Sequence, residues 1–231
     1  MRLPTLNFFI FLFFLNCSKE TIQKEFLIFQ DPYNSNSSTS GSDNINSGSD
    51  NINQRLKKSP CENGMASIYP CKGYDFVSRI TLDEFESTSA NDNWGWTDPE
   101  TGIEYVISGL NDGTAFVSIE DPENPIYLGK LPTSTFPSDY RDIKVYNSHA
   151  FIVSEAPDHG LQVFDLTRLR GITEFQSFNA DVTLQDFGNA HNIAINEQSG
   201  FAFVVGSNLY QGGPVFIDVN DPKKPKIVGG F

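Results

Sequence analysis

From about Tyr74 to the end, the chain is a series of short apolar runs rich in β-branched and aromatic residues. Gly, Pro, Asn and Asp separate these runs, which is typical of strands joined by turns. No amphipathic helical pattern of ordinary length interrupts them, although "LTRLRG" (166–171) favours one helical turn. The pattern predicts an all-β fold of short strands.

The runs recur about every 50 residues, and each copy predicts a strand, a tight turn and a second strand. The copies are "NWGWTDPETGIEYVISG" (93–109), "DIKVYNSHAFIVSEA" (142–156) and "NIAINEQSGFAFVVGS" (192–207). Each copy is followed by a third run: "TAFVSIE" (114–120), "LQVFDL" (161–166) and "PVFIDV" (214–219). Four short strands per repeat fit the blade of a β-propeller, and a β-sandwich with recurring turns is the alternative.

A proline element marks the end of two copies. Asp121-Pro122 and Pro125 match Asp221-Pro222 and Pro225 without a gap. Asp followed by Pro predicts a type I turn whose carboxylate accepts a backbone N–H. The later proline then begins a fourth, edge strand, "IYLGKL" (126–131) or "KIVGGF" (226–231), where a missing donor is tolerated. The middle copy lacks these prolines and runs from "VFDL" into "TRLRG".

Longer strings carry a resemblance to a known family. "GTAFVSIEDPENPIYLG" and "GGPVFIDVNDPKKPKIVG" resemble LVIVD-type repeats. "CENGMASIYPCKGYDFVSRITLDEF" and the copies after it resemble the choice-of-anchor B family from Cys61 to Phe231. The resemblance implies a β-propeller in an exported protein that is attached to the cell surface, with no assigned reaction.

The number of repeats indicates whether the predicted propeller is complete. About three blades fit within residues 61–231, whereas propellers close with roughly four to eight. We therefore expect a partial β-propeller, the N-terminal part of a longer, truncated family domain. Self-assembly into a closed ring is the alternative.

The first 16 residues predict a lipoprotein signal peptide. Arg2 is followed by the apolar run Phe8 to Leu15, which is too short for a bilayer crossing of about 20 residues. The run stops at Cys17, the expected lipidation site, although Asn16 departs from the usual small residue of a lipobox. An ordinary secretory signal is the alternative. By resemblance to the common sorting rule, Ser18 favours the outer membrane.

Residues 17–60 predict a disordered tether rich in Ser, Asn and Gly. The segment "NSNSSTSGSDNINSGSDNIN" (34–53) repeats GSDNIN and holds only two apolar residues, too few to offset the entropy of ordering. A lipid and a flexible tether would hold the domain at residues 61–231 away from a membrane.

The net charge limits the classes of partner that the sequence predicts, and the cysteines indicate the compartment. The net charge of −13 and the pI of about 4.5 argue against nucleic acid and against electrostatic binding to anionic lipid. Cys61 and Cys71 are ten residues apart and predict a local disulfide in an oxidising compartment. Free thiols, or partners elsewhere in a longer chain, are the alternatives.

Candidate chemistry is sparse, because nucleophile, metalloprotease and phosphate-loop motifs are absent. His149 and His159 fit turns. In a propeller the first strand of each blade lines a central channel, so the residues that open the first strands would meet at its mouth. These candidate ligand-binding residues are Asp92, Asn93, Arg141, Asp142, His191 and Asn192. Alternatively, these side chains cap the ends of their strands. A metal ion in the channel is the one cofactor that this set of residues suggests.

Trp94 and Trp96 alternate along one strand and predict either an aromatic binding platform or core packing. Together these features favour a non-enzymatic lipoprotein of the cell surface or periplasm, bound to the outer membrane through its lipid. A protein or carbohydrate would be the partner. The alternatives are a metal-dependent enzyme acting at the channel and a non-functional remnant.

Overall fold

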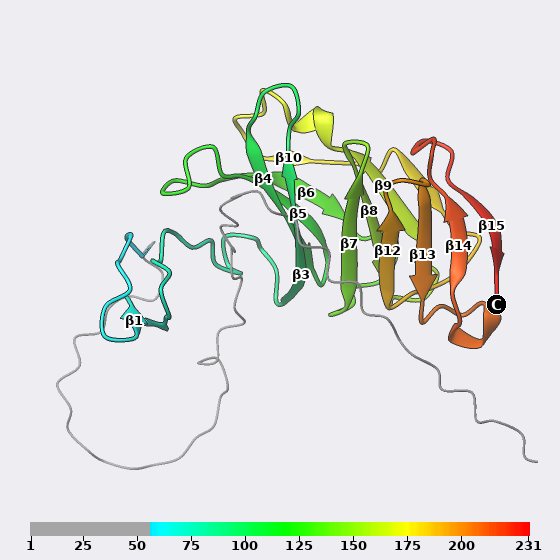
Figure 1. The fold of residues 1–231 in the computed structure, drawn as a ribbon, viewed down its shortest axis with the longest axis horizontal. Helices are drawn as coiled ribbons and strands as arrows, with labels where there is room; N and C mark the ends of the chain where they lie inside the picture. The colour runs from blue at the N-terminus through cyan, green and yellow to red at the C-terminus, as the bar shows by residue number, and fades with distance from the viewer. Residues whose placement is uncertain (1–55) are drawn as a thin grey trace, which may run out of the picture.

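The computed structural model describes residues 56–231, and this part of the chain is all-β (Figure 1). Two short 3-10 helices, η1 (Leu166–Leu169) and η2 (Tyr210–Gly212), are the other regular elements in it. None of the helices described is long and apolar enough to cross a membrane. The predicted signal peptide (1–16), Cys17 and all but the last residues of the predicted tether (17–60) lie outside the described residues.

Three sheets follow one another along the chain, and in each the strands lie side by side largely in chain order. The first sheet contains β3 (Ala90–Thr97), β4 (Glu104–Leu110), β5 (Gly113–Ser118) and β6 (Ile126–Pro132). The second contains β7 (Arg141–Tyr146), β8 (His149–Ser154), β9 (Leu161–Asp165) and β11 (Val182–Leu184). The third contains β12 (Asn192–Asn196), β13 (Phe201–Val205), β14 (Val215–Asp218) and β15 (Lys226–Gly230). The all-β prediction is confirmed, and none of the described sheets closes on itself.

The two proline turns have the predicted geometry. The Asp121 carboxylate accepts the Glu123 N–H at 3.0 Å, and the Asp121 carbonyl accepts the Asn124 N–H at 3.0 Å. Asp221 forms the same two bonds with Lys223 and Lys224. In each case the next strand, β6 or β15, begins directly after the second proline. Local sequence therefore determines where these strands start.

The middle repeat departs from the expected path. Its third strand passes into η1, where the Asp165 side chain accepts the Thr167 N–H and so caps the helix. The chain then pairs with the first sheet, because β10 (Gln176–Ser177) runs parallel to β6. It returns as β11, antiparallel to β9. The fourth strand of this repeat therefore comes late, and the first sheet gains a fifth strand.

Alternation along the second strand of each sheet builds two inter-sheet cores. On β4, Tyr105 and Ile107 face the second sheet, where they meet Ala150 and Ile152 of β8. The intervening residues of β8, Phe151 and Val153, face the third sheet. Period-two alternation in a strand thus lets every sheet serve as a partner for two neighbours.

The far face of the first sheet is covered by the chain that precedes it. Phe85 is buried there against Val106 and Val117, with Ile80 packed beside them. Before this segment come the short strands β1 (Met65–Ala66) and β2 (Tyr69–Pro70), and Cys61 and Cys71 are joined by a disulfide around them. The first sheet is therefore packed on both faces.

Candidate functional site

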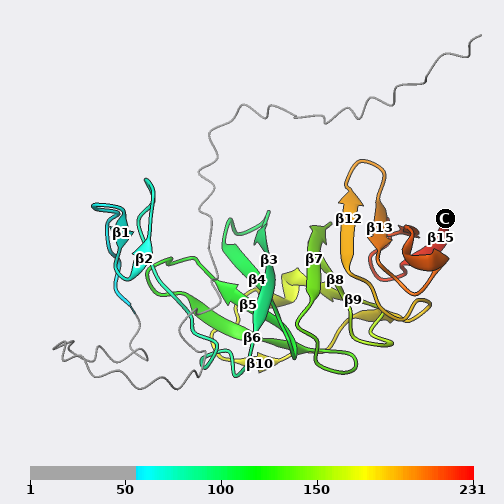
Figure 2. The ribbon, with the colours of Figure 1, turned by 90° about the horizontal axis from the view of Figure 1, so that it is seen from below.

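The first strands of the three sheets, β3, β7 and β12, lie side by side along one side of the molecule (Figure 2). We call the side chains gathered there the first-strand rim: Asp92, Asn93, Trp94, Asp142, Lys144 and Asn192. These residues come from three repeats, and their proximity follows from the packing of one sheet on the next. Most of the channel residues predicted from the sequence belong to this rim.

An identical carboxylate contact joins each pair of neighbouring sheets. Asp92 Oδ2 accepts the Ile143 N–H at 2.9 Å, and Asp142 Oδ2 accepts the Ile193 N–H at 2.7 Å. Both bonds join residues 51 positions apart. A side chain that satisfies a strand N–H of the next repeat fixes the relative position of the two sheets. We call these two contacts the aspartate clasps.

The two clasp carboxyl groups differ in charge state. Burial, together with a hydrogen bond to Asp142, raises the pKa of Asp92 to about 6, although the Ile143 N–H acts in the other direction. Burial also acts to raise the pKa of Asp142, but hydrogen bonds from Lys144 and the Ile193 N–H hold it below its usual value. Asp92 is thus the carboxyl that carries the proton in mildly acidic solution, and Asp142 is the anion.

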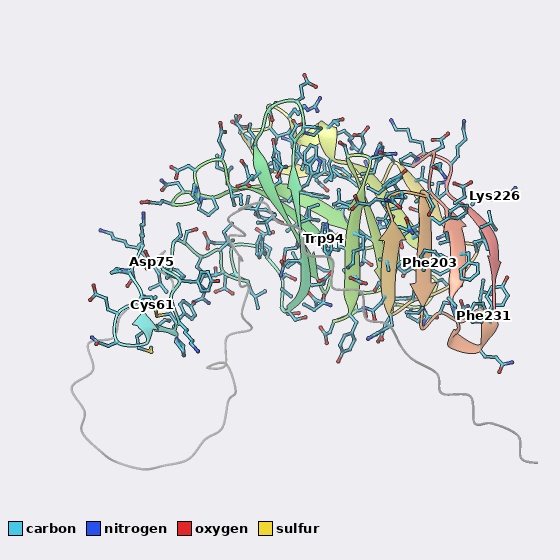
Figure 3. The ribbon with its side chains drawn as sticks, viewed as in Figure 1. Cys61, Asp75, Trp94, Phe203, Lys226 and Phe231 are labelled. Carbon is cyan, nitrogen blue, oxygen red and sulfur yellow. A yellow bond between two sulfur atoms is a disulfide. The ribbon has the colours of Figure 1, made fainter. Side chains whose placement is uncertain are left out.

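Trp94 is exposed at the rim (Figure 3), and Lys144 is half-buried beside it. The Lys144 ammonium lies 2.5 Å from Asp142 Oδ1 and 4.4 Å from the centre of the Trp94 ring. Trp94 keeps 40% of its surface exposed. Asn93 is exposed beside it, and Asn192 is exposed on β12, where its amide donates to Asp142 Oδ2 at 3.2 Å. Lys144 was not among the residues singled out from the sequence; its alternation with Asp142 in "RDIKVY" was the available signal.

Arg141 is not part of an open channel mouth. Its guanidinium is buried, where Nε donates to the Leu110 carbonyl at 2.6 Å and another nitrogen lies 2.9 Å from His159 Nε2. His159 Nδ1 donates to the Gly160 carbonyl, and burial lowers the pKa of His159 to about 4, so its Nε2 is the acceptor. The side chains of Arg141 and His159 therefore join the first two sheets and are withdrawn from a ligand.

His191 lies apart from the carboxylates of the clasps. Its Nδ1 contacts Glu155, and its ring lies 6.1 Å from that of Tyr140. The side chain is exposed, so it stands at the surface between the second and third sheets. His149, expected in a solvated turn, instead opens β8 with a largely buried side chain near Asp165.

The expected pair of tryptophans does not form a platform. Trp96 is only 7% exposed and stacks on Tyr105 within the core between the first two sheets. Trp94 lies two residues earlier on the same strand and is only partly covered there, by Lys144 of the neighbouring sheet. The alternative of core packing thus holds for Trp96, and Trp94 alone offers an aromatic surface.

Sequence reasoning missed one ion pair between sheets. Asp98, in the turn after β3, is buried and accepts two hydrogen bonds from Arg170, at 2.7 and 2.6 Å. These bonds lower the pKa of Asp98. Arg170 follows η1, so the helical turn that replaces the proline element places this guanidinium against the first sheet. The pairing crosses 72 positions and has no local sequence signal.

Among residues 56–231, no three or more His, Cys, Asp or Glu side chains are placed to hold one metal ion. Searches against models of protein families and against curated proteins found no match to this sequence.

Proposed function

We propose that this protein is an exported, lipid-tethered binding protein whose propeller-type domain presents the first-strand rim to a partner outside the cell. The observation that carries the proposal is the exposed Trp94 ring, with Lys144 held beside it, on a frame fixed by the aspartate clasps. An aromatic ring held beside a cation and exposed amides is a recognition surface with little conformational freedom to lose on binding.

The propeller assignment is supported by the arrangement of the sheets. Each contains four antiparallel strands of one repeat, and the first strands β3, β7 and β12 lie next to one another. That is the order expected of blades placed around an axis. The resemblance to LVIVD-type repeats and to the choice-of-anchor B family agrees with it and gives the context: export, a lipid at Cys17 and a flexible tether.

The hydrogen bonds of the rim favour binding over catalysis. Asp92 and Asp142 accept strand N–H groups, and Lys144 is paired with Asp142. A general base or nucleophile needs a free lone pair aimed at a substrate, and these carboxylates are committed to holding the sheets. We propose a carbohydrate as the partner class, because Trp94 supplies a stacking surface and Asn192 supplies an amide at the same rim.

A glycan array tests the binding proposal. The wild-type protein is expected to bind one group of related glycans, and Trp94→Ala should abolish that binding. Tyr74→Ala, which removes another exposed aromatic ring, one that precedes the first sheet in the chain, is the matched control and should bind normally. If no glycan binds, or if both variants lose binding equally, the proposed carbohydrate site at the rim is wrong.

Two further measurements test the tether and the absence of catalysis. Growth with a labelled fatty acid should label the mature wild-type protein but not Cys17→Ser. Metal analysis of the purified protein should find no stoichiometric transition metal. A stoichiometric metal that disappears in His191→Ala would instead support the metal-dependent enzyme.

A further inference from the structure

The outer face of the third sheet has the same construction as two faces that are buried between sheets. Ile107, Phe151 and Phe203 occupy the same place in β4, β8 and β13, because each lies opposite an equivalent third-strand residue, Phe116, Val163 or Phe216. In each strand the residue just before it, Val106, Ala150 or Ala202, packs in the opposite direction. The three sheets therefore each present an equivalent forward face, toward the side of the next repeat.

Burial separates the third forward face from the other two. Ile107 and Phe151 are both 0% exposed, whereas Phe203 is 36% exposed. Two positions further along, Val153 is 0% exposed, whereas Val205 is 37% exposed. The first two faces are covered by the following sheet, and nothing within residues 56–231 covers the third.

Further apolar groups extend this face. Phe216 lies opposite Phe203 in the β13–β14 ladder, with ring centres 5.5 Å apart, and Phe231 packs on Phe216 at 5.7 Å. Val228 is exposed on β15. Figure 3 places Phe203 and Phe231 at the end of the molecule away from the first sheet. A continuous apolar surface of this kind marks an interaction site in a soluble protein.

We propose that the forward face of the third sheet is a dimer interface, occupied by the same face of a second copy of this chain. Continuity with the two internal interfaces shows what the face is built to meet: the apolar side of a β-sheet. A two-fold dimer supplies such a side from an identical patch.

The charges on the face permit a second copy to approach. The chain has a net charge of −13, yet the forward residues of its strands include one acid, Asp218, and one base, Lys226. These two lie opposite each other in the β14–β15 ladder, so their charges cancel. Like-charge repulsion is thus weakest where the two copies would meet.

The second copy must bind face to face rather than head to tail. A head-to-tail contact would bring this face against the far side of the first sheet. Phe85 and Ile80 already occupy that side, and Phe85 is buried there. A ring closed by copies in series would need this segment to move away, whereas the symmetric dimer leaves it in place.

The size of the face sets the expected affinity. Four strands about 4.8 Å apart, each of about five residues rising 3.3 Å, give a surface of roughly 300 Å² per copy. Phe231 enlarges it, but it stays below the roughly 800 Å² per partner of a standard stable interface. We therefore expect a dissociation constant in the micromolar range rather than an obligate dimer.

Sedimentation equilibrium of the full chain carrying Cys17→Ser tests the dimer without association through lipid. The mass should rise from monomer to dimer as the concentration increases to roughly 100 μM, well above a micromolar dissociation constant. Phe203→Glu should weaken association about 30-fold or more, as loss of a central anchor does. Phe136→Glu changes another exposed phenyl group, one outside this face, and should associate like the starting protein.

Folding and stoichiometry are checked in the same samples. The thermal midpoint of Phe203→Glu below the association range should stay close to that of the starting protein, because the phenyl ring is partly exposed in the monomer and loses there only its edge contact with Phe216. A starting protein that stays monomeric at every concentration overturns the proposal. So does equal association of the Phe203 and Phe136 variants, or a mass that continues past two copies. Glycan binding at the rim is unaffected by any of these outcomes, so the two proposals fail separately.

Discussion

Asp92→Asn is expected to stabilise the protein above pH 6, an unusual result for removing a buried carboxyl group. The folded protein raises the pKa of Asp92 to about 6, above its ordinary value of 3.8. Folding therefore favours the protonated form, and the stability that Asp92 contributes is lost as the pH rises through about 6. Asparagine can replace the protonated acid, because its oxygen accepts the Ile143 N–H and its amide donates to Asp142.

The magnitude follows from the shift. A change of about two pKa units corresponds to about 3 kcal/mol between the two protonation states. Partial access of water to Asp92 reduces this figure, so we expect Asp92→Asn to gain about 1–2 kcal/mol at pH 8. Below the ordinary pKa of 3.8 the wild-type carboxyl is protonated in both the folded and the unfolded protein, so the two proteins should there have nearly equal unfolding free energies. The third repeat supports the exchange, since Asn192 stands 50 positions after Asp142 and already donates to it.

Urea unfolding followed by tryptophan fluorescence, from about pH 3.5 to pH 8, measures this difference, because both tryptophans lie in β3. Asp142→Asn is the matched control, and its sign should be opposite. Hydrogen bonds hold the pKa of Asp142 below its usual value, so losing that charge removes the Lys144 pair and destabilises the protein at neutral pH. A stability difference for Asp92→Asn that does not change with pH would refute the argument that folding raises the pKa of Asp92. So would a loss of stability at pH 8.

Three other substitutions test the contacts between elements. Arg170→Met should lower the free energy of unfolding at pH 7, because it removes the partner of the buried Asp98 carboxylate. The difference from the wild type should shrink below about pH 4 as Asp98, whose pKa is lowered in the folded state, becomes protonated. Urea unfolding at pH 7 and below pH 4 measures the difference. Gly129→Ala would place a Cβ 2.1 Å from a carbonyl oxygen of β10 and should cost roughly 1–3 kcal/mol in a thermal melt, whereas Gly95→Ala faces open space and should not. Cys71→Ser removes the disulfide that closes a short loop and should destabilise the folded form of that loop by about 2–3 kcal/mol. Proteolysis between residues 61 and 71 should become faster, and the unfolding transition seen by the fluorescence of the β3 tryptophans should change little.

The strands could be predicted from sequence because their determinants are local. Short apolar runs define β4, β8 and β13, and Asp121-Pro122 defines the turn before β6 within four residues. The route of the chain after β9 could not be predicted in this way. Whether a short strand pairs with its own sheet or with β6 of the preceding one depends on backbone groups contributed by another repeat.

The same distinction between local and non-local determinants applies to the candidate site. The sequence placed Asp92, Asp142 and Asn192 together correctly, because equivalent positions of packed repeats must lie close in space. It could not show that Arg141, next to Asp142, turns inward, since that depends on the Leu110 carbonyl and on His159, which only the folded chain brings within reach.

Alternation also explains why neighbours on one strand differ so much in role. Residues 141 and 142 point to opposite faces of β7, so one is buried against the first sheet while the other reaches the third. The pair therefore joins all three sheets from a single strand. A ligand at the rim would thus contact a surface whose geometry is fixed on both sides, which is why we expect binding to change the rim side chains and to leave the sheets where they are.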